Sequence, residues 1–325
     1  MFRIAFKPLP FLINYNNPVN FDKRMNTHSF VLLLGLSRFV SYGRKPELPE
    51  DGIFPFIVYF ESRSRGMCVG SLVSRVVVLT AAVCVAGPNG EVHDRRPVTV
   101  VTGTRYRHPL RGVRVPVIRV LMPKLPEHTD ERRYMLQKSV ALLLLQKRIP
   151  DIMVEHPLRA IGIDYTGEDL MTSQDECVVV GWHFLYAEDG KLPEQWWLVH
   201  RQMRYQVLQL KDKKDDACAE LVRAYEQTAD DLKHVGDVDD VMCFRDPNNT
   251  AQPCHGMYGA PLVCAKGRVV GLLAAPSAQW RHCDRMSILV HKLSSHRNKA
   301  FLECFETLLQ PEYLIKWELF LNKTT

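Results

Sequence analysis

No stretch of this 325-residue sequence reaches the roughly 18 consecutive apolar residues that a membrane-spanning helix needs, so no membrane span is predicted. No two cysteines have the Cys-x-x-Cys spacing of a structural zinc site, and neither a metal nor a cofactor is predicted. The net charge of +6 is smaller than we expect of a nucleic-acid-binding domain, so no nucleic-acid partner is predicted. This mildly basic balance still permits weak binding of an anionic glycan.

The nine cysteines are dispersed along the chain, which suits a protein of an oxidising compartment. Eight of them could pair in four disulfides and would leave one over. Two glycosylation candidates, Asn248 and Asn322, lie in Asn-x-Thr sequons. These features together predict a secreted, extracellular glycoprotein with disulfide bonds.

The N-terminal region contains a short apolar run over residues 30–36, preceded by Lys23 and Arg24. This order resembles a secretory signal peptide that starts at Met25. A charged residue interrupts the run and no Ala-x-Ala cleavage site follows, so a disordered tail with a chance apolar cluster is the alternative. We expect residues 1–45 to form a signal peptide or leader and a disordered tail.

From residue 54 onward, short segments rich in Val, Ile and Leu alternate with clusters of Gly, Pro and Asp. The predicted strands are 54–60, 71–83, 96–104, 112–122, 140–145, 176–182, 196–210, 260–275 and 286–293. Many short strands with turn signals predict an all-β barrel or sandwich. Helical spacing predicts a helix over 217–232 and an amphipathic helix from residue 311 onward.

Four sequence motifs follow one another along the chain: CVGSLVSRVVVLTAAVC at 68–84, KSVALL at 138–143, CVVVGW at 177–182 and CHGMYGAPLVC at 254–264. The first, second and fourth resemble the blocks that carry the catalytic histidine, aspartate and serine of trypsin/chymotrypsin-like serine proteases of the S1 type. The third resembles the Cys-x-x-x-Gly-Trp block of the same family. The resemblance covers about residues 46–293, and the chain is identified as a member of that family.

The resemblance implies an all-β fold of two packed six-stranded antiparallel β-barrels, followed by a C-terminal helix. The implied divisions are a trypsin-like domain over 46–300, a first barrel over about 46–165, a second over about 166–300, and a C-terminal helical tail over 301–325. The implied disulfides are Cys68–Cys84, Cys177–Cys264, Cys218–Cys243 and Cys254–Cys283. Cys304 is left over, and we expect it to be a buried thiol rather than an intermolecular bridge.

The catalytic positions of the family are occupied here by Val83, Ser139 and Tyr258. Valine has no nitrogen to accept a proton, a neutral serine cannot stabilise an imidazolium, and a phenol on a rigid ring cannot replace a serine hydroxyl. Two nearby histidines, His183 and His255, have no evident serine partner. The sequence therefore predicts a pseudoenzyme without catalytic residues, and an active serine-type endopeptidase is the disfavoured alternative.

Other parts of the family's machinery are also altered. Gly256 of the oxyanion hole is retained, but Ala260 replaces a glycine and predicts a changed backbone. Met257 stands where an aspartate would receive the freed amino terminus of an activated protease, and no Ile-Val-Gly-Gly terminus is present. Gln252 occupies the specificity-pocket position, and Pro276 has no N–H to pair with a substrate strand.

A basic segment carries Arg105, Arg107, Arg111 and Arg114. It could bind sulfated glycans, other anionic surfaces or an acidic protein. Because only alternate residues of a strand share a face, the four side chains need not form one patch, and a solvated loop and strand face is the preferred interpretation.

Two functions are compatible with these observations. The first is a secreted pseudoprotease that acts by protein–protein contacts, as a cofactor or decoy in an extracellular protease cascade, with a protease, a serpin or another cascade component as its partner. The second is an anionic glycan-binding module that reuses the same fold.

Overall fold

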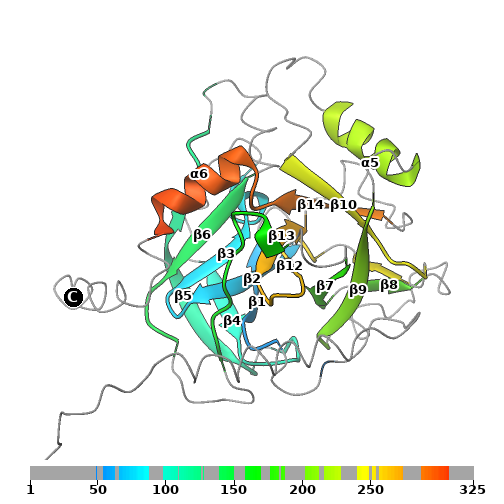
Figure 1. Cartoon of the computed structure of the whole chain (residues 1–325). Coiled ribbons are helices and arrows are strands. Elements are labelled where there is room, and N and C mark those ends of the chain that lie inside the picture. The colour runs from blue at the N-terminus through cyan, green and yellow to red at the C-terminus, as the bar shows by residue number, and fades with distance from the viewer. Residues whose placement is uncertain are drawn as a thin grey trace, which may run out of the picture.

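The protein consists mainly of two closed barrels, each of six antiparallel strands, in its computed structural model (Figure 1). The structure describes residues 49, 54–62, 66–87, 98–108, 110–125, 127, 139–149, 158–169, 176–182, 184–186, 202–211, 216–227, 240–248, 251–253, 256–273 and 287–306. This architecture confirms the predicted all-β class and the two-barrel arrangement implied by the family resemblance.

The strands of the first barrel follow the order β1-β2-β3-β6-β5-β4. Their bounds are β1 Ile57–Ser62, β2 Gly66–Ser74, β3 Val77–Ala81, β4 Thr99–Thr102, β5 Val113–Leu121 and β6 Val140–Leu145. Every residue of β3 and β6 is buried. Continuous apolar sequence is expected of strands that are covered on both faces, and these two strands carry the segments that meet at the candidate site.

The strands of the second barrel follow the order β10-β14-β13-β12-β7-β9. Their bounds are β7 Glu176–Gly181, β9 Arg204–Lys211, β10 Val241–Arg245, β12 Pro261–Val263, β13 Val269–Leu273 and β14 Ser287–Lys292. A separate two-stranded sheet pairs β8, Phe184–Tyr186, with β11, Ala251–Pro253.

The helices with described bounds are α5, Asp216–Gln227, α6, His296–Cys304, and the short 3-10 helix η2, Ala82–Cys84. Helix α5 overlaps the helix predicted over 217–232 and begins one residue before it, and residues 228–232 lie outside the described residues. Helix α6 begins at a capping serine, because the Ser295 hydroxyl accepts a hydrogen bond from the Asn298 amide. It starts before the C-terminal tail predicted over 301–325, and the helix predicted from residue 311 lies outside the described residues.

Three disulfides are present, with the pairing that the resemblance implies: Cys68–Cys84, Cys177–Cys264 and Cys218–Cys243. The first joins residues 16 positions apart and contributes about 3 kcal/mol in the chain-entropy treatment of such loops. Cys254 and Cys283 lie outside the described residues.

The expectation of a buried Cys304 is wrong, because this free thiol is exposed. The buried face of α6 carries Asn298, Phe301 and Leu302. At about 100° per residue, position 304 lies about 120° around the helix from position 298, at the edge of this buried face, and it is the last residue of α6.

Two buried aspartates fix the connection between the barrels. Asp164 accepts hydrogen bonds from the Thr166 hydroxyl at 2.8 Å and from the amides of Gly167 at 2.9 Å and Asp169 at 2.8 Å. Burial opposes ionisation of Asp164, but these hydrogen bonds outweigh it and hold its pKa below the usual range. Burial raises the pKa of Asp169 instead, although the Lys266 amide donates to its carboxylate at 2.8 Å.

Candidate functional site

The three segments that carry Val83, Ser139 and Tyr258 meet where the two barrels contact each other. Val83 lies in η2, and the amide of the preceding residue, Ala82, donates to the Ser139 carbonyl at 2.9 Å. From the second barrel, the Tyr258 carbonyl accepts a hydrogen bond from the Val69 amide of β2 at 2.9 Å. The backbone therefore brings together the residues that the motifs assign to the catalytic positions.

All three side chains are enclosed. Val83 is 2% exposed, Ser139 0% and Tyr258 1%. Tyr258 is among the largest fully buried side chains of the described residues. A nucleophile must reach its substrate, so neither the Ser139 hydroxyl nor the Tyr258 phenol is positioned to attack a peptide from solution.

Gly259 fixes the backbone beside Tyr258. Its φ is +75°, and a Cβ at this position would lie 2.4 Å from the Thr80 Oγ1 and 2.5 Å from the Val69 carbonyl oxygen. The Thr80 hydroxyl donates to that carbonyl at 2.8 Å, so these atoms leave no space for a Cβ at position 259. Only glycine fits this close approach between the barrels.

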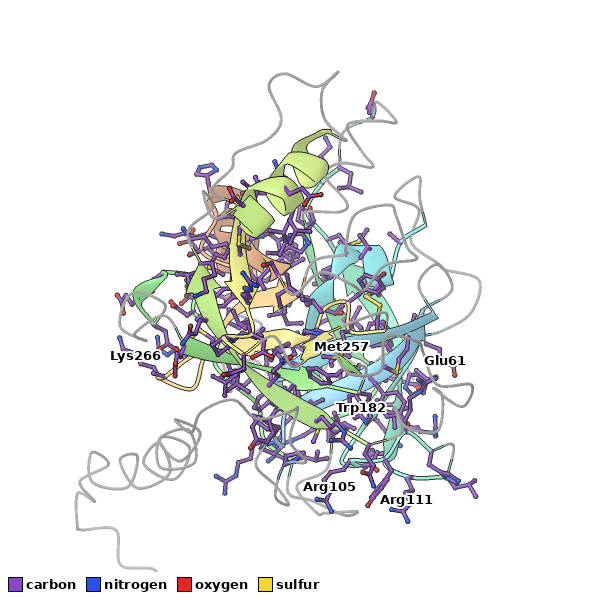
Figure 2. All side chains as sticks on the ribbon, turned by 90° about the vertical axis from the view of Figure 1, so that its right-hand side faces the viewer. Glu61, Arg105, Arg111, Trp182, Met257 and Lys266 are labelled. Carbon is purple, nitrogen blue, oxygen red and sulfur yellow. A yellow bond between two sulfur atoms is a disulfide. The ribbon has the colours of Figure 1, made fainter. Side chains whose placement is uncertain are left out.

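Met257 fills the position where the family resemblance implies an aspartate. Its side chain is fully buried, and a Cβ on Gly181 would lie 2.3 Å from the Met257 Sδ. The thioether therefore packs directly against the Gly181 backbone, next to Trp182, toward the middle of the molecule (Figure 2). A flexible apolar side chain can fill such an irregular space without a charged partner.

The sequence left open whether the arginines of the basic segment form one patch, and the structure brings two of them, Arg105 and Arg111, to one aromatic ring. Both guanidinium groups contact the Tyr106 ring, with Cζ at 6.0 Å and 4.7 Å from its centroid. Strand alternation does not apply to these residues, because 103–112 form the loop between β4 and β5, and the strand begins only at Val113. Sequence reasoning placed Trp182 in a family motif but did not predict its contact with this loop, where its indole N–H donates to the Arg105 carbonyl at 3.0 Å.

Several predicted site residues are placed only in part. Gln252 lies in β11, where its backbone pairs with Leu185 of β8. Asn248 is exposed and follows β10, as a glycosylation acceptor must be. The remaining ones lie outside the described residues: Cys254, Cys283, His183, His255, Pro276 and Asn322.

Within the part of the chain that the structure describes, no group of three or more His, Cys, Asp or Glu residues is placed to hold a metal ion. None of the helices in those same ranges is both long and apolar enough to cross a membrane.

Comparison with known proteins identifies the family. The family described as Trypsin matches residues 47–284. The crystal structure of a scabies mite inactivated protease paralogue has a TM-score of 0.56 at 17% identity, over 81% of this chain and 96% of that chain. A structure named HL collagenase has a TM-score of 0.55 at 18% identity, over 80% of this chain and 97% of that chain. At these identities the two structures show a shared fold, and the family match over most of the barrels shows that this chain belongs to the trypsin family.

Proposed function

We propose that this protein is a secreted, non-catalytic member of the trypsin family that acts by binding another extracellular protein, as a cofactor or decoy in a protease cascade. The observation that carries the proposal is the enclosed cluster of valine, serine and tyrosine at the catalytic positions. Peptide hydrolysis on this fold needs a base to take the proton from a hydroxyl and a carboxylate to hold that base. Val83, Ser139 and Tyr258 supply neither the base nor the carboxylate.

The described histidines do not supply a substitute base. His108 belongs to the β4–β5 loop, His291 to β14 and His296 to the first turn of α6, whereas Tyr258 follows Met257 at the contact between the barrels. General-base catalysis requires the base within hydrogen-bond reach of the hydroxyl.

Two further observations support the proposal. Three disulfides suit a protein that folds in an oxidising compartment. One structural neighbour is named as an inactivated protease paralogue, so the trypsin fold without protease activity has a precedent by that name.

The proposal is tested with purified full-length protein, incubated with a fluorophosphonate probe and with a peptide amide substrate, before and after treatment with trypsin that is then inhibited. We expect neither covalent labelling nor amide-bond turnover. The variant Tyr258→Ser is the matched control. It restores a serine hydroxyl but still lacks a base, so it should stay inactive. Labelling or turnover by the unmodified protein above the level of an inhibitor-treated sample would refute the non-catalytic assignment.

An anionic glycan-binding role is the second candidate, because arginines gather in one loop. Retention on heparin that rising salt abolishes, and that disappears when Arg105, Arg107 and Arg111 are neutralised, would establish this role instead.

A further inference from the structure

The turn that follows β10 carries one of the two Asn-x-Thr sequons of the chain. Strand β10 ends at Arg245, and Asn248 is followed by Asn249 and Thr250 before β11 begins at Ala251. The residue between the acceptor and the threonine is an asparagine, and only proline is excluded at that position. Because the motif is short, the place of the acceptor in the fold decides whether a glycan can be carried there.

The acceptor residue lies on the surface. Asn248 and the preceding Pro247 form an exposed turn, whereas Asp246 at the start of the turn is 3% exposed. An N-linked glycan is bulky and solvated, so the residue that carries it must be accessible in the folded protein. Exposed turns between strands accept such additions best, because the core of the barrel is left unchanged.

The backbone of this turn is held by the buried aspartate. The Asp246 Oδ1 accepts a hydrogen bond from the Asn248 amide N–H at 3.0 Å, which closes an Asx-turn. Pro247 between them has a restricted φ and suits the second position of a turn. The backbone of Asn248 is therefore fixed at the end of β10, while the residue itself remains exposed to solvent.

The side-chain amide of Asn248 is not used by the fold. It takes part in no hydrogen bond within the part of the chain that the structure describes, where the contact of this residue is made by its backbone N–H. Asn298 of α6 is the opposite case, since it is 1% exposed and its Nδ2 donates to the Lys292 carbonyl at 3.0 Å. A sugar on the Asn298 Nδ2 would disrupt this hydrogen bond, whereas a sugar on the Asn248 Nδ2 replaces only contacts with water.

The turn also lies away from the first barrel. It connects β10 to β11, which pairs with β8, and both β10 and β8 are on the right-hand side of Figure 1, opposite β5 and β6 of the first barrel. A glycan at this turn therefore starts on the outside of the second barrel.

The neighbouring disulfide requires the compartment in which N-linked glycans are added. Cys243 of β10 lies five residues before Asn248 and is bonded to Cys218 of α5. Such bonds form in the lumen of the secretory pathway and are rare in the cytosol. The inference below rests on secretion, which is part of the proposed function.

We propose that Asn248 carries an N-linked glycan in the secreted protein. The reaction joins the Asn248 Nδ2 to the anomeric carbon of the first N-acetylglucosamine, with an oligosaccharide on a polyprenyl pyrophosphate carrier as the donor. The bond between that carbon and the pyrophosphate breaks, the carrier leaves with its pyrophosphate, and Nδ2 gives up one proton. Nothing is oxidised or reduced, and Thr250 supplies the hydroxyl that the sequon requires.

The experiment expresses the full-length chain in an animal cell line and identifies the modified residue by mass spectrometry. Protein from the medium and from the cell lysate is treated with peptide N-glycosidase in water enriched in heavy oxygen, which removes the glycan and leaves a heavy-labelled aspartate at the acceptor. After reduction, trypsin releases the peptide 246–266, which contains Asn248 and no other sequon. We expect the heavy label at position 248.

Four variants separate the acceptor from its neighbours. N248Q and T250A each destroy the sequon, so each should migrate on a gel as a chain that lacks one glycan. T250S keeps the sequon and N249Q changes only the adjacent asparagine, so both should keep the glycan. N248Q should unfold at the same urea concentration as the enzymatically deglycosylated protein, because the side-chain amide has no role in the fold, and the loss of the glycan is then not a result of misfolding.

A second chain, with a heterologous signal peptide fused before Met1, keeps failure of the site apart from failure of secretion. Absence of the heavy label at position 248 in this fused chain would overturn the proposal, as would a label that survives in T250A. A label at position 248 in the fused chain but not in the unfused one would support the acceptor site and refute the secretion that the proposed function includes. None of these results touches the non-catalytic assignment, which fails only on fluorophosphonate labelling or amide-bond turnover.

Discussion

The contact between Met257 and Gly181 gives a direct test of how the protein fills the space where the family resemblance implies a charged pair. In the variant Gly181→Ala, the new Cβ would overlap the Met257 Sδ at 2.3 Å and Cε at 2.6 Å. Met257 is fully buried, so its end group has little room to move away. Overpacking of this kind costs about 1–3 kcal/mol.

The variant Met257→Ala should be destabilised by about 2–5 kcal/mol, because it leaves a cavity in a closed core. In that background the added methyl of Gly181→Ala enters the vacated space. The double variant should therefore be less destabilised than the sum of the two single variants, with a coupling of about 2 kcal/mol. A coupling of this sign is specific to two side chains that compete for one volume.

The assay is urea unfolding followed by tryptophan fluorescence, with disulfides intact, because Trp182 is buried immediately beside Gly181. Gly162→Ala is the control, since the nearest atom to its Cβ is the Arg268 Cγ at 3.7 Å. Its cost should be the same with and without Met257. Additive costs at Gly181 and Met257, or a Gly181→Ala variant as stable as the control, would show that the space is not filled by the thioether.

Three other predictions follow from the structure. Gly259→Ala should lower the free energy of unfolding by about 3 kcal/mol and Gly103→Ala by about 1 kcal/mol, because both have similar φ but only the first Cβ meets backbone atoms; equal costs in urea unfolding would contradict this. Asp164→Asn should cost about 2 kcal/mol at pH 7. Since the folded-state pKa is lowered, the carboxylate's contribution is complete above the unfolded pKa and is lost as pH falls through the folded one, so the difference in stability between the two proteins should begin to shrink below about pH 4 and vanish only below the folded-state pKa; a constant difference would count against the reasoning. The native protein should take up one maleimide label at the exposed Cys304 and none in Cys304→Ser, and labelling that persists in the variant would contradict the predicted Cys254–Cys283 bridge.

The strands that could be predicted best are those with uninterrupted apolar sequence. The predicted strand 140–145 coincides with β6, which is buried throughout. The predicted strand 71–83 is wrong as one element, because it contains the end of β2, a turn and β3. That turn uses the Ser74 hydroxyl, which accepts from the Val76 amide at 3.4 Å, rather than the Gly, Pro or Asn that signal a turn in sequence.

The predicted strand 260–275 is divided in the same way into β12 and β13. The sequence does contain a turn signal here, namely Gly267, which has a φ of +71° in the connecting turn. Strand β10, Val241–Arg245, was missed entirely. Its few apolar residues follow an acidic stretch, and only its pairing with β14 and β9 makes it a barrel strand.

The proposed lack of catalytic chemistry is argued from residue types alone, because valine, serine and tyrosine have fixed donor and acceptor groups. The enclosure of Tyr258 and the packing of Met257 on Gly181 could not be predicted from the sequence. Both depend on the distance between segments about 75 or more residues apart in the chain, which only the closed barrels determine.

For the basic segment, the sequence analysis recognised the residues but could not predict how they are arranged in space. Arg105 and Arg111 lie in a loop that reverses between Gly103 and Gly112, and this reversal brings both side chains to the ring of Tyr106. The same reversal leaves Leu110 at the exposed end of the loop. Tyr258 and Met257 close the interior where this fold otherwise acts on peptides, while hydrogen bonds from Trp182 and Met203 fix a charged loop on the outside. A protein with this distribution of buried and exposed groups can recognise another molecule through its surface rather than through its interior.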